Sequence, residues 1–168
     1  MSKEGYKWRV IYTKSRQEKK VAEYLTERGI THYLPTIKTL KQWKDRKKMV
    51  EDVLFKSYIF VNLSEKEYYE ALTHPGAVKY VSFEGKAASM PDSQMEIIKT
   101  TIENKLEFDI SNEHFAKGSI VKIANGPLKG TSGEIVSLSG KKKLLIRINE
   151  IGYSLLVHLS PAYLQKPD

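Results

Sequence analysis

The residues that could carry out chemistry do not form any catalytic or metal-binding pattern. The chain contains no cysteine, which excludes disulfides, thiolate catalysis and cysteine-ligated zinc. Its four histidines lack partners at metal-ligand spacing; they are His32, His74, His114 and His158. The sequence shows no phosphate-binding glycine loop, nucleophile elbow or paired-carboxylate motif. We expect no catalytic residue, metal or cofactor, with an enzyme of dispersed catalytic residues as the alternative.

Positive charge is the chemistry that the sequence does offer. The chain has 28 Lys and Arg against 20 Asp and Glu, a net charge of +8. Such an excess favours polyanions such as DNA or RNA. The densest basic segment spans residues 38–48; its cations would bind phosphates and its aromatic ring would stack on an unpaired base. The nucleic-acid-binding residues expected there are Lys41, Trp43, Lys44, Arg46, Lys47 and Lys48. A solvated hairpin tip is the alternative.

Strands and helices alternate over the first hundred residues and must position these side chains. Apolar alternation predicts strands at 8–13, 33–37, 53–63 and 78–83. Helical spacing predicts helices at 15–29, 64–72 and 91–106, the first two opened by Ser–Glu capping boxes. This order predicts an antiparallel sheet with helices packed on it.

The residue composition and the periodicity of the chain change after residue 108. Residues 109–116 are polar and lack periodicity, which predicts a linker. Glycines then separate short strands expected at 120–123, 134–138, 144–148 and 153–159, as in a small β-barrel. The fold class is therefore α+β, with one domain at 1–108 and a second at 117–168. The sequence contains no apolar run of eighteen residues and no apolar core of a secretion signal near its first residue, so we expect a cytoplasmic protein without a membrane partner. We also expect a monomer.

The start of the second domain carries a specific glycine pattern. The run Gly118-Ser-Ile-Val-Lys-Ile-Ala-Asn-Gly-Pro-Leu-Lys-Gly-Thr-Ser-Gly-Glu-Ile-Val resembles a KOW motif in its SH3-like barrel. Ile120 and Ile123 would pack the first strand, and Gly130 and Gly133 would provide positive φ or close backbone approach. KOW motifs also occur in ribosomal proteins. A ribosome-associated or RNA-binding protein without a polymerase partner is therefore an alternative.

The first domain separates these cases. The segments Trp8-Arg-Val-Ile-Tyr-Thr-Lys, Glu18-Lys-Lys-Val-Ala and Leu54-Phe-Lys-Ser-Tyr-Ile-Phe-Val resemble the N-terminal domain of the NusG family. The two resemblances together span residues 6–165 and imply a non-catalytic elongation factor that binds RNA polymerase and modulates pausing, termination or antitermination. The basic segment resembles the UpxY-type paralogues of Bacteroidota, which implies an operon-specific antiterminator. One departure is Lys56-Ser57, where the family usually has Pro-Gly.

The resemblance also implies binding residues. The clamp helices of the polymerase would contact Trp8, Tyr12, Phe55 and Tyr58, for which ordinary core packing is the alternative. Upstream or non-template DNA at the transcription bubble would contact Lys14, Lys19, Lys20 and Arg28, for which a solvated helix face is the alternative.

A second partner is implied for the KOW domain. Ile151, in the turn Glu150-Ile151-Gly152, would be exposed to the Rho factor or a small-subunit ribosomal protein. Its alternative role is to cover the end of the barrel.

Overall fold

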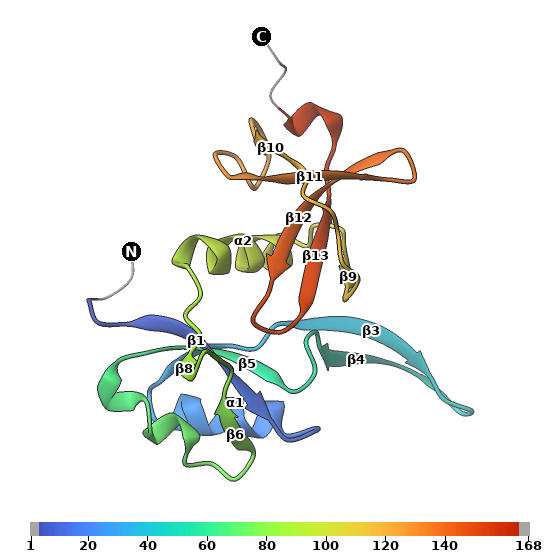
Figure 1. Ribbon diagram of the computed structural model, residues 1–168. Coiled ribbons are helices and arrows are strands. Elements are labelled where there is room, and N and C mark those ends of the chain that lie inside the picture. Colours follow the sequence, from blue (N-terminus) through green and yellow to red (C-terminus); the bar gives the residue numbers. More distant parts are fainter. Residues whose placement is uncertain (1–3, 165–168) are drawn as a thin grey trace. The chain divides into compact units, whose positions relative to one another are not determined.

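The structure is a computed structural model that describes residues 4–164 (Figure 1). The first three residues of the first domain and the last four of the second lie outside the described residues. The chain divides into two compact units, residues 1–92 and 93–168. Both contain antiparallel sheets, so the expected α+β class is confirmed.

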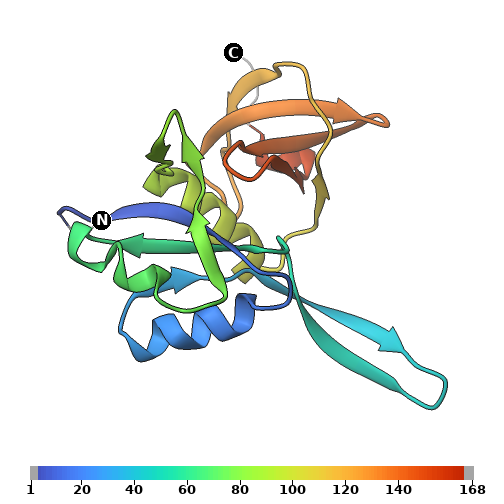
Figure 2. The same ribbon diagram turned by 60° about the horizontal axis from the view of Figure 1, so that its bottom comes forward.

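The first unit is built on a four-stranded antiparallel sheet of order β2-β5-β1-β6. Its strands are β1 (Lys7–Thr13), β2 (Thr31–Tyr33), β5 (Tyr58–Leu63) and β6 (Ala77–Tyr80). Helix α1 (Glu18–Glu27) runs along one face of this sheet (Figure 2). A small hairpin of β7 (Ser82–Phe83) and β8 (Lys86–Ala87) follows β6.

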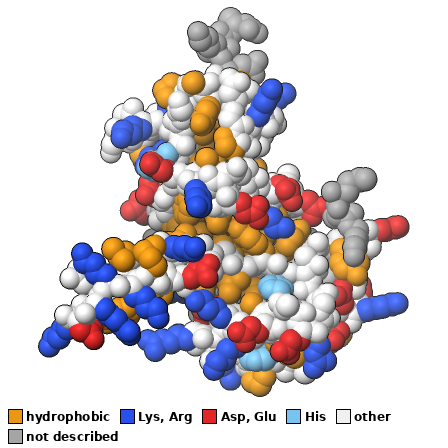
Figure 3. All heavy atoms as spheres, turned by 180° about the vertical axis from the view of Figure 1, so that it is seen from behind, with side chains coloured by type: hydrophobic (Ala, Val, Ile, Leu, Met, Phe, Trp, Pro, Cys, Tyr) orange, Lys and Arg blue, Asp and Glu red, His pale blue; other side chains and the backbone are white. Residues whose placement is uncertain are grey.

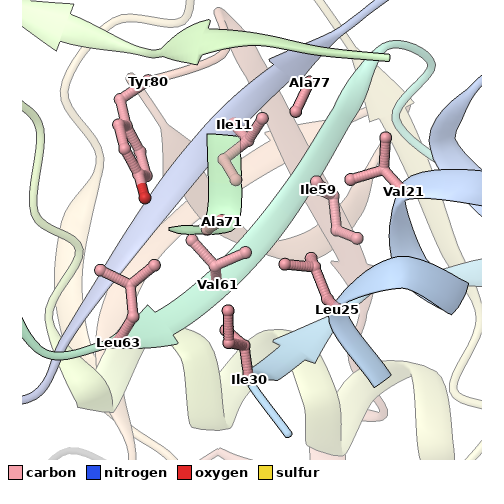
Figure 4. Close-up of a cluster of buried hydrophobic side chains, with 10 residues drawn as sticks. All are labelled: Ile11, Val21, Leu25, Ile30, Ile59, Val61, Leu63, Ala71, Ala77 and Tyr80. Atoms are coloured by element: carbon pink, nitrogen blue, oxygen red, sulfur yellow. The ribbon is translucent and has the colours of Figure 1, made fainter. Parts of the chain in front are cut away.

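The core of the first unit lies between the sheet and α1 (Figure 4). Ile11 and Ile59 are direct partners across β1 and β5, so their side chains leave the same face of the sheet. They pack with Val21 and Leu25 of α1, and all four side chains are fully buried. Burying each such aliphatic side chain contributes roughly 1.5–3 kcal/mol.

The helix starts differ from the prediction. The residue that caps α1 is Gln17, without a side-chain cap, so the capping box expected at Ser15 and Glu18 is wrong. The second box exists, because Ser64 donates from N and Oγ to Glu67 Oε1 at 3.1 and 3.0 Å. It opens two 3-10 turns, η1 (Glu65–Glu67) and η2 (Glu70–Leu72), instead of an α-helix. Few residues remain before a proline and a glycine end the segment, too few for a stable α-helix.

Residues 36–53 form a two-stranded hairpin that we call the arm. It consists of β3 (Thr36–Gln42) and β4 (Lys47–Val53) and projects from the first unit (Figure 1). The strand predicted at 33–37 is therefore broken, because Pro35 lacks the N–H needed to continue the sheet. The strand predicted at 53–63 is broken too, by a turn at 54–57.

The second unit contains a five-stranded antiparallel sheet of order β10-β11-β12-β13-β9. Its elements are α2 (Asp92–Glu103), β9 (Phe108–Ser111), β10 (Ser119–Lys122), β11 (Ser132–Leu138), β12 (Lys141–Ile148), β13 (Tyr153–His158) and η3 (Pro161–Tyr163). The expected linker at 109–116 is wrong for its first three residues, because Asp109 to Ser111 pair with β13. The apolar Phe108 and Ile110 alternate with polar residues, a strand pattern that the prediction overlooked.

Two glycines of the glycine-rich run have the expected roles. Gly130 has φ +89°, a left-handed conformation that side chains rarely adopt. A Cβ on Gly133 would lie 2.6 Å from Leu144 Cδ1, so only glycine fits there without a shift. Ile120 differs from expectation: it is exposed, on the edge strand β10, while Ile123 is buried.

An ion pair joins β11, β12 and the preceding loop in the second unit. Arg147 Nε lies 2.8 Å from Glu134 Oε2, and its Nη2 donates to the carbonyl oxygen of Phe115 at 2.9 Å. The hydrogen bond from Arg147 lowers the pKa of Glu134 and raises that of Arg147 itself. The pair therefore holds the loop before β10 against the sheet.

Candidate protein and nucleic-acid interfaces

Tyr12 and Tyr58 form a surface pair on the first unit. They are direct partners across β1 and β5. Their ring centroids lie 5.7 Å apart and their planes meet at 61°, an edge-to-face contact. Tyr12 is 39% exposed and Tyr58 is half-buried. Such contacts fix the rings in place, so the pair presents a preorganised aromatic surface.

The structure places the other two predicted aromatics in the interior. Trp8 is 5% exposed and Phe55 is 1% exposed. The Phe55 ring lies edge-on to Phe60, with centroids 6.1 Å apart. A partner cannot reach them in this conformation, so the expected four-residue surface pocket is corrected to the pair Tyr12 and Tyr58. The physical reason is that large apolar rings gain most from complete removal from water.

A turn at residues 55–58 sets the position of Tyr58. Tyr58 N donates to Phe55 O at 3.2 Å, and Thr13 N donates to Ser57 O at 2.8 Å. Ser57 has φ +71°, the sign that the third position of a type II turn requires. Serine thus retains the bend that the family's Pro-Gly would favour, at the expense of a left-handed conformation.

The arm carries the expected cluster of cations and Trp43, all exposed. Its tip is closed by a hydrogen bond from Trp43 N to Arg46 O at 2.8 Å. The Arg46 guanidinium lies 5.6 Å from the centroid of the Trp43 ring, a cation–π contact. Lys41 Nζ is paired with Asp52 at 3.3 Å. In Figure 3, basic and hydrophobic side chains alternate along the arm.

The four cations predicted on or near α1 are exposed but differ in their partners. Lys19 Nζ donates to Glu51 O at 2.7 Å, which ties the helix to the base of the arm. Arg28 pairs with Glu70 at 3.6 Å. Lys14 and Lys20 make no ion pair within residues 4–164. These two are therefore available to phosphates.

A hollow of about 530 Å³ lies between the start of α1 and the base of the arm. Four cations and three carboxylates are among its lining residues, which are Ser15, Arg16, Glu18, Lys19, Lys41, Glu51, Asp52, Val53, Lys56 and Ser57. The mixed charge makes it a polar recess that connects the arm with the helix. No three His, Asp or Glu side chains in the described part of the chain could hold a metal ion together.

The expected exposure of Ile151 is wrong. The side chain is 6% exposed, in the turn between β12 and β13. Ile151 N donates to Ile148 O at 3.1 Å, and Gly152 follows with φ +72°. This apolar side chain is removed from water instead of being presented to a partner.

Sequence reasoning missed the four most exposed large apolar side chains among the described residues of the first unit. They are Leu40 (57%), Met49 (56%), Tyr69 (78%) and Phe83 (74%). Leu40 and Met49 lie on the arm, and their position beside the basic residues was the available signal. No comparable pattern marks Tyr69 or Phe83, because an aromatic residue type does not distinguish an exposed side chain from a buried one.

No helix among the described residues is long and apolar enough to cross a membrane.

The chain is similar to one protein family and to several solved structures. Residues 6–99 match the sequence profile of the family NusG, described as "Transcription termination factor nusG". The solved structure "Domain interaction in Thermotoga maritima NusG" is 22% identical, with a TM-score of 0.50, and the match covers 97% of this chain and 98% of that one. A chain of the "MjSpt4:Spt5 complex conformation A" is 14% identical, with a TM-score of 0.31 and coverage of 94% and 96%. No curated protein matches.

Proposed function

This chain belongs to the NusG family, and from that premise we propose that Tyr12 and Tyr58 bind the clamp helices of RNA polymerase. Family membership supports a role as a transcription elongation factor. Its proposed action is to hold the polymerase in the state that favours elongation, because a ligand shifts a conformational equilibrium toward the state that it binds better.

The observation that carries this proposal is the exposed edge-to-face pair of Tyr12 and Tyr58. A helix tip needs a rigid aromatic surface to bind, and aromatic side chains are prominent among interface hot spots. The hydrogen bond from Thr13 N to Ser57 O, 2.8 Å long, links β1 to the turn before Tyr58. The rings therefore need little ordering when a partner binds, which favours affinity.

Upstream or non-template DNA at the bubble is the proposed second contact. The cations of the arm and the unpaired Lys14 and Lys20 would bind phosphates, while Trp43 would stack on an unpaired base. A nucleic-acid contact beside a polymerase contact would keep the factor at the bubble during elongation. A cytoplasmic location follows from this role.

The KOW-like second unit is proposed to recruit another partner, either the Rho factor or a small-subunit ribosomal protein. Its connection to the first unit raises the effective concentration of that partner near the polymerase. The basic arm, in turn, supports the proposal that the chain is an operon-specific antiterminator. A sequence-dependent DNA contact by the arm would restrict the factor to particular transcripts. The polymerase contact is proposed for the first unit, residues 1–92, and the KOW role for the part of the second unit that begins at residue 117.

A pull-down with purified cognate RNA polymerase tests the polymerase contact. Tyr58→Ala is compared with Tyr69→Ala, a matched control, because Tyr69 is also exposed and also makes an edge-to-face tyrosine contact, with centroids 5.1 Å apart. We expect Tyr58→Ala to weaken the free energy of polymerase binding by about 2 kcal/mol, as at an interface hot spot. Tyr69→Ala should bind like wild type. Equal binding by all three proteins would reject the assignment. Failure of wild type to bind, with capture by ribosomes instead, would favour the ribosome-associated alternative.

A further inference from the structure

Two exposed aliphatic side chains face each other in the middle of the arm. Leu40 on β3 and Met49 on β4 are direct cross-strand partners, so both side chains leave the same face of the ribbon. Each is more than half exposed. An aliphatic pair held at this exposure on a projecting hairpin is an apolar contact surface without a cover in the first unit.

Cations lie on both sides of this pair. Side chains two residues apart in a strand share a face, so Lys38 and Lys47 lie on the same face as Leu40 and Met49, one toward the base and one toward the tip. Each is about 7 Å along its strand from the pair, at about 3.4 Å per residue. Neither makes an ion pair within residues 4–164.

Of the arm's three acidic residues, which are Asp45, Glu51 and Asp52, only Glu51 lies on this face of the paired strands. Glu51 is opposite Lys38, and its Oε1 accepts a hydrogen bond from Thr36 Oγ1 at 2.9 Å, so this carboxylate offsets part of the positive charge at the base of the arm. Asp52 pairs with Lys41, on the other face of the ribbon. The face of Leu40 and Met49 is therefore apolar at its centre, basic toward the tip at Lys47, and of mixed charge toward the base, where Lys38 lies opposite Glu51.

This chemistry fits a nucleic-acid duplex end better than a protein groove or a single strand. Lysines on both sides of the pair match the two phosphate backbones that border a base pair, whereas an unpaired base stacks on an aromatic ring. Aliphatic side chains instead act as wedges against base steps, which they partly unstack. A two-stranded ribbon is also narrow enough to approach a groove of DNA.

We propose that Leu40 and Met49 press against the terminal base pair at a junction between duplex and single-stranded DNA, with Lys38 and Lys47 on the flanking phosphates. The inference rests on the proposed nucleic-acid role of the arm and adds the kind of DNA that the arm recognises. Trp43, at the tip, remains free to stack on the unpaired strand beyond the junction.

The test uses the full chain, a forked DNA with 2-aminopurine in the base pair at the junction, and a single strand of equal length. The variant Leu40→Thr/Met49→Thr removes the apolar pair while keeping residues that favour strands. Phe83→Thr is the matched control, because it removes an even more exposed apolar side chain from the β7–β8 hairpin. Intrinsic fluorescence of Trp8 and Trp43 on heating establishes that each variant folds.

We expect wild type and Phe83→Thr to prefer the fork and to raise the 2-aminopurine fluorescence. The double variant should bind the fork on the order of tenfold more weakly, without the fluorescence rise, and should bind the single strand like wild type. Unchanged fork binding and fluorescence in the double variant would overturn the wedge while leaving the nucleic-acid role in place. In the polymerase pull-down described above, a double variant that lost polymerase binding but kept fork binding would identify the pair as a protein contact. That result would also overturn the wedge. Failure of wild type to bind either DNA would refute the nucleic-acid role itself.

Discussion

Replacing Ser57 with glycine is expected to stabilise the first unit. Ser57 has φ +71°, and a left-handed conformation costs a residue with a Cβ about 1–2 kcal/mol. Glycine removes that cost but loses more chain entropy on folding, about 0.5–1 kcal/mol. The difference between these two ranges spans about 0–1.5 kcal/mol, and the expected net gain in the free energy of unfolding lies near its centre, at about 0.5–1 kcal/mol.

The substitution should leave the contacts of the turn intact. The hydrogen bond that Ser57 accepts from Thr13 N uses its backbone oxygen, which glycine also has. No side-chain hydrogen bond of Ser57 is found among residues 4–164, so the hydroxyl can be removed without leaving a partner unpaired. Tyr58 should keep its position, and polymerase binding should not change.

Tryptophan fluorescence on heating or in urea measures this effect selectively. Both tryptophans of the chain, Trp8 and Trp43, lie in the first unit, so the signal does not report on the second. A gain of this size raises the midpoint of the thermal transition by about 2–8 °C for a unit of this length. Ser57→Ala is the control and should be near neutral, because it keeps the Cβ. A glycine variant no more stable than the alanine variant would refute the reasoning about this turn.

Three further predictions concern charge and packing. Changing Lys47 and Lys48 to Gln should reduce the slope of log binding constant against log salt by about 2 for duplex DNA in anisotropy titrations, and an unchanged slope would remove them from the interface. Glu134 has a lowered pKa, so it contributes stability above the ordinary pKa of a glutamate, and this stability is lost as pH falls through the lower folded pKa. Glu134→Gln should therefore lose stability at pH 7 but little at pH 2 in urea titrations followed by circular dichroism, and an equal loss at both would contradict this. Gly133→Ala would bring a Cβ within 2.6 Å of Leu144 and should destabilise the second unit by about 1–3 kcal/mol in the same titrations, whereas a neutral result would mean that the leucine moves freely.

Local patterns predicted most of the secondary structure. Alternation in residues 8–13 matches β1, and the helical spacing of Met95 and Ile98 matches their burial in α2. These patterns succeed because one face of each element is removed from water and the sequence records which face it is. Turn residues such as Gly130 succeed for a local reason too, since their conformation excludes most side chains.

The misses required information that no local pattern contains. Pro35 separated β2 from the arm, and the pairing of β9 with β13 depends on residues more than forty positions apart. The capping box at Ser15 failed because a competing backbone turn delays the helix, with Gln17 N donating to Lys14 O at 3.1 Å. A local sequence pattern shows which elements are possible, and contacts between residues distant in the sequence decide which of them form.

The candidate site was predicted in residue type more accurately than in exposure. Tyr12 and Tyr58 are accessible, whereas Phe55 and Trp8 are buried, although all four are aromatic. Register explains part of this, because the pairing of β1 with β5 places Tyr12 beside Tyr58. Ile151 shows the same limit: an apolar residue in a turn can be exposed or covered, and its neighbours in the sequence do not decide which.

A single-round transcription assay with purified cognate RNA polymerase tests the central claim most directly. Pause lifetimes are measured without factor, with wild type, with Tyr58→Ala and with the control Tyr69→Ala. If the chain acts on elongation through the Tyr12 and Tyr58 pair, wild type and Tyr69→Ala should change the lifetimes equally, and folded Tyr58→Ala should leave them as they are without factor. Lifetimes that wild type does not alter, or that Tyr58→Ala alters as strongly as wild type, would contradict the account.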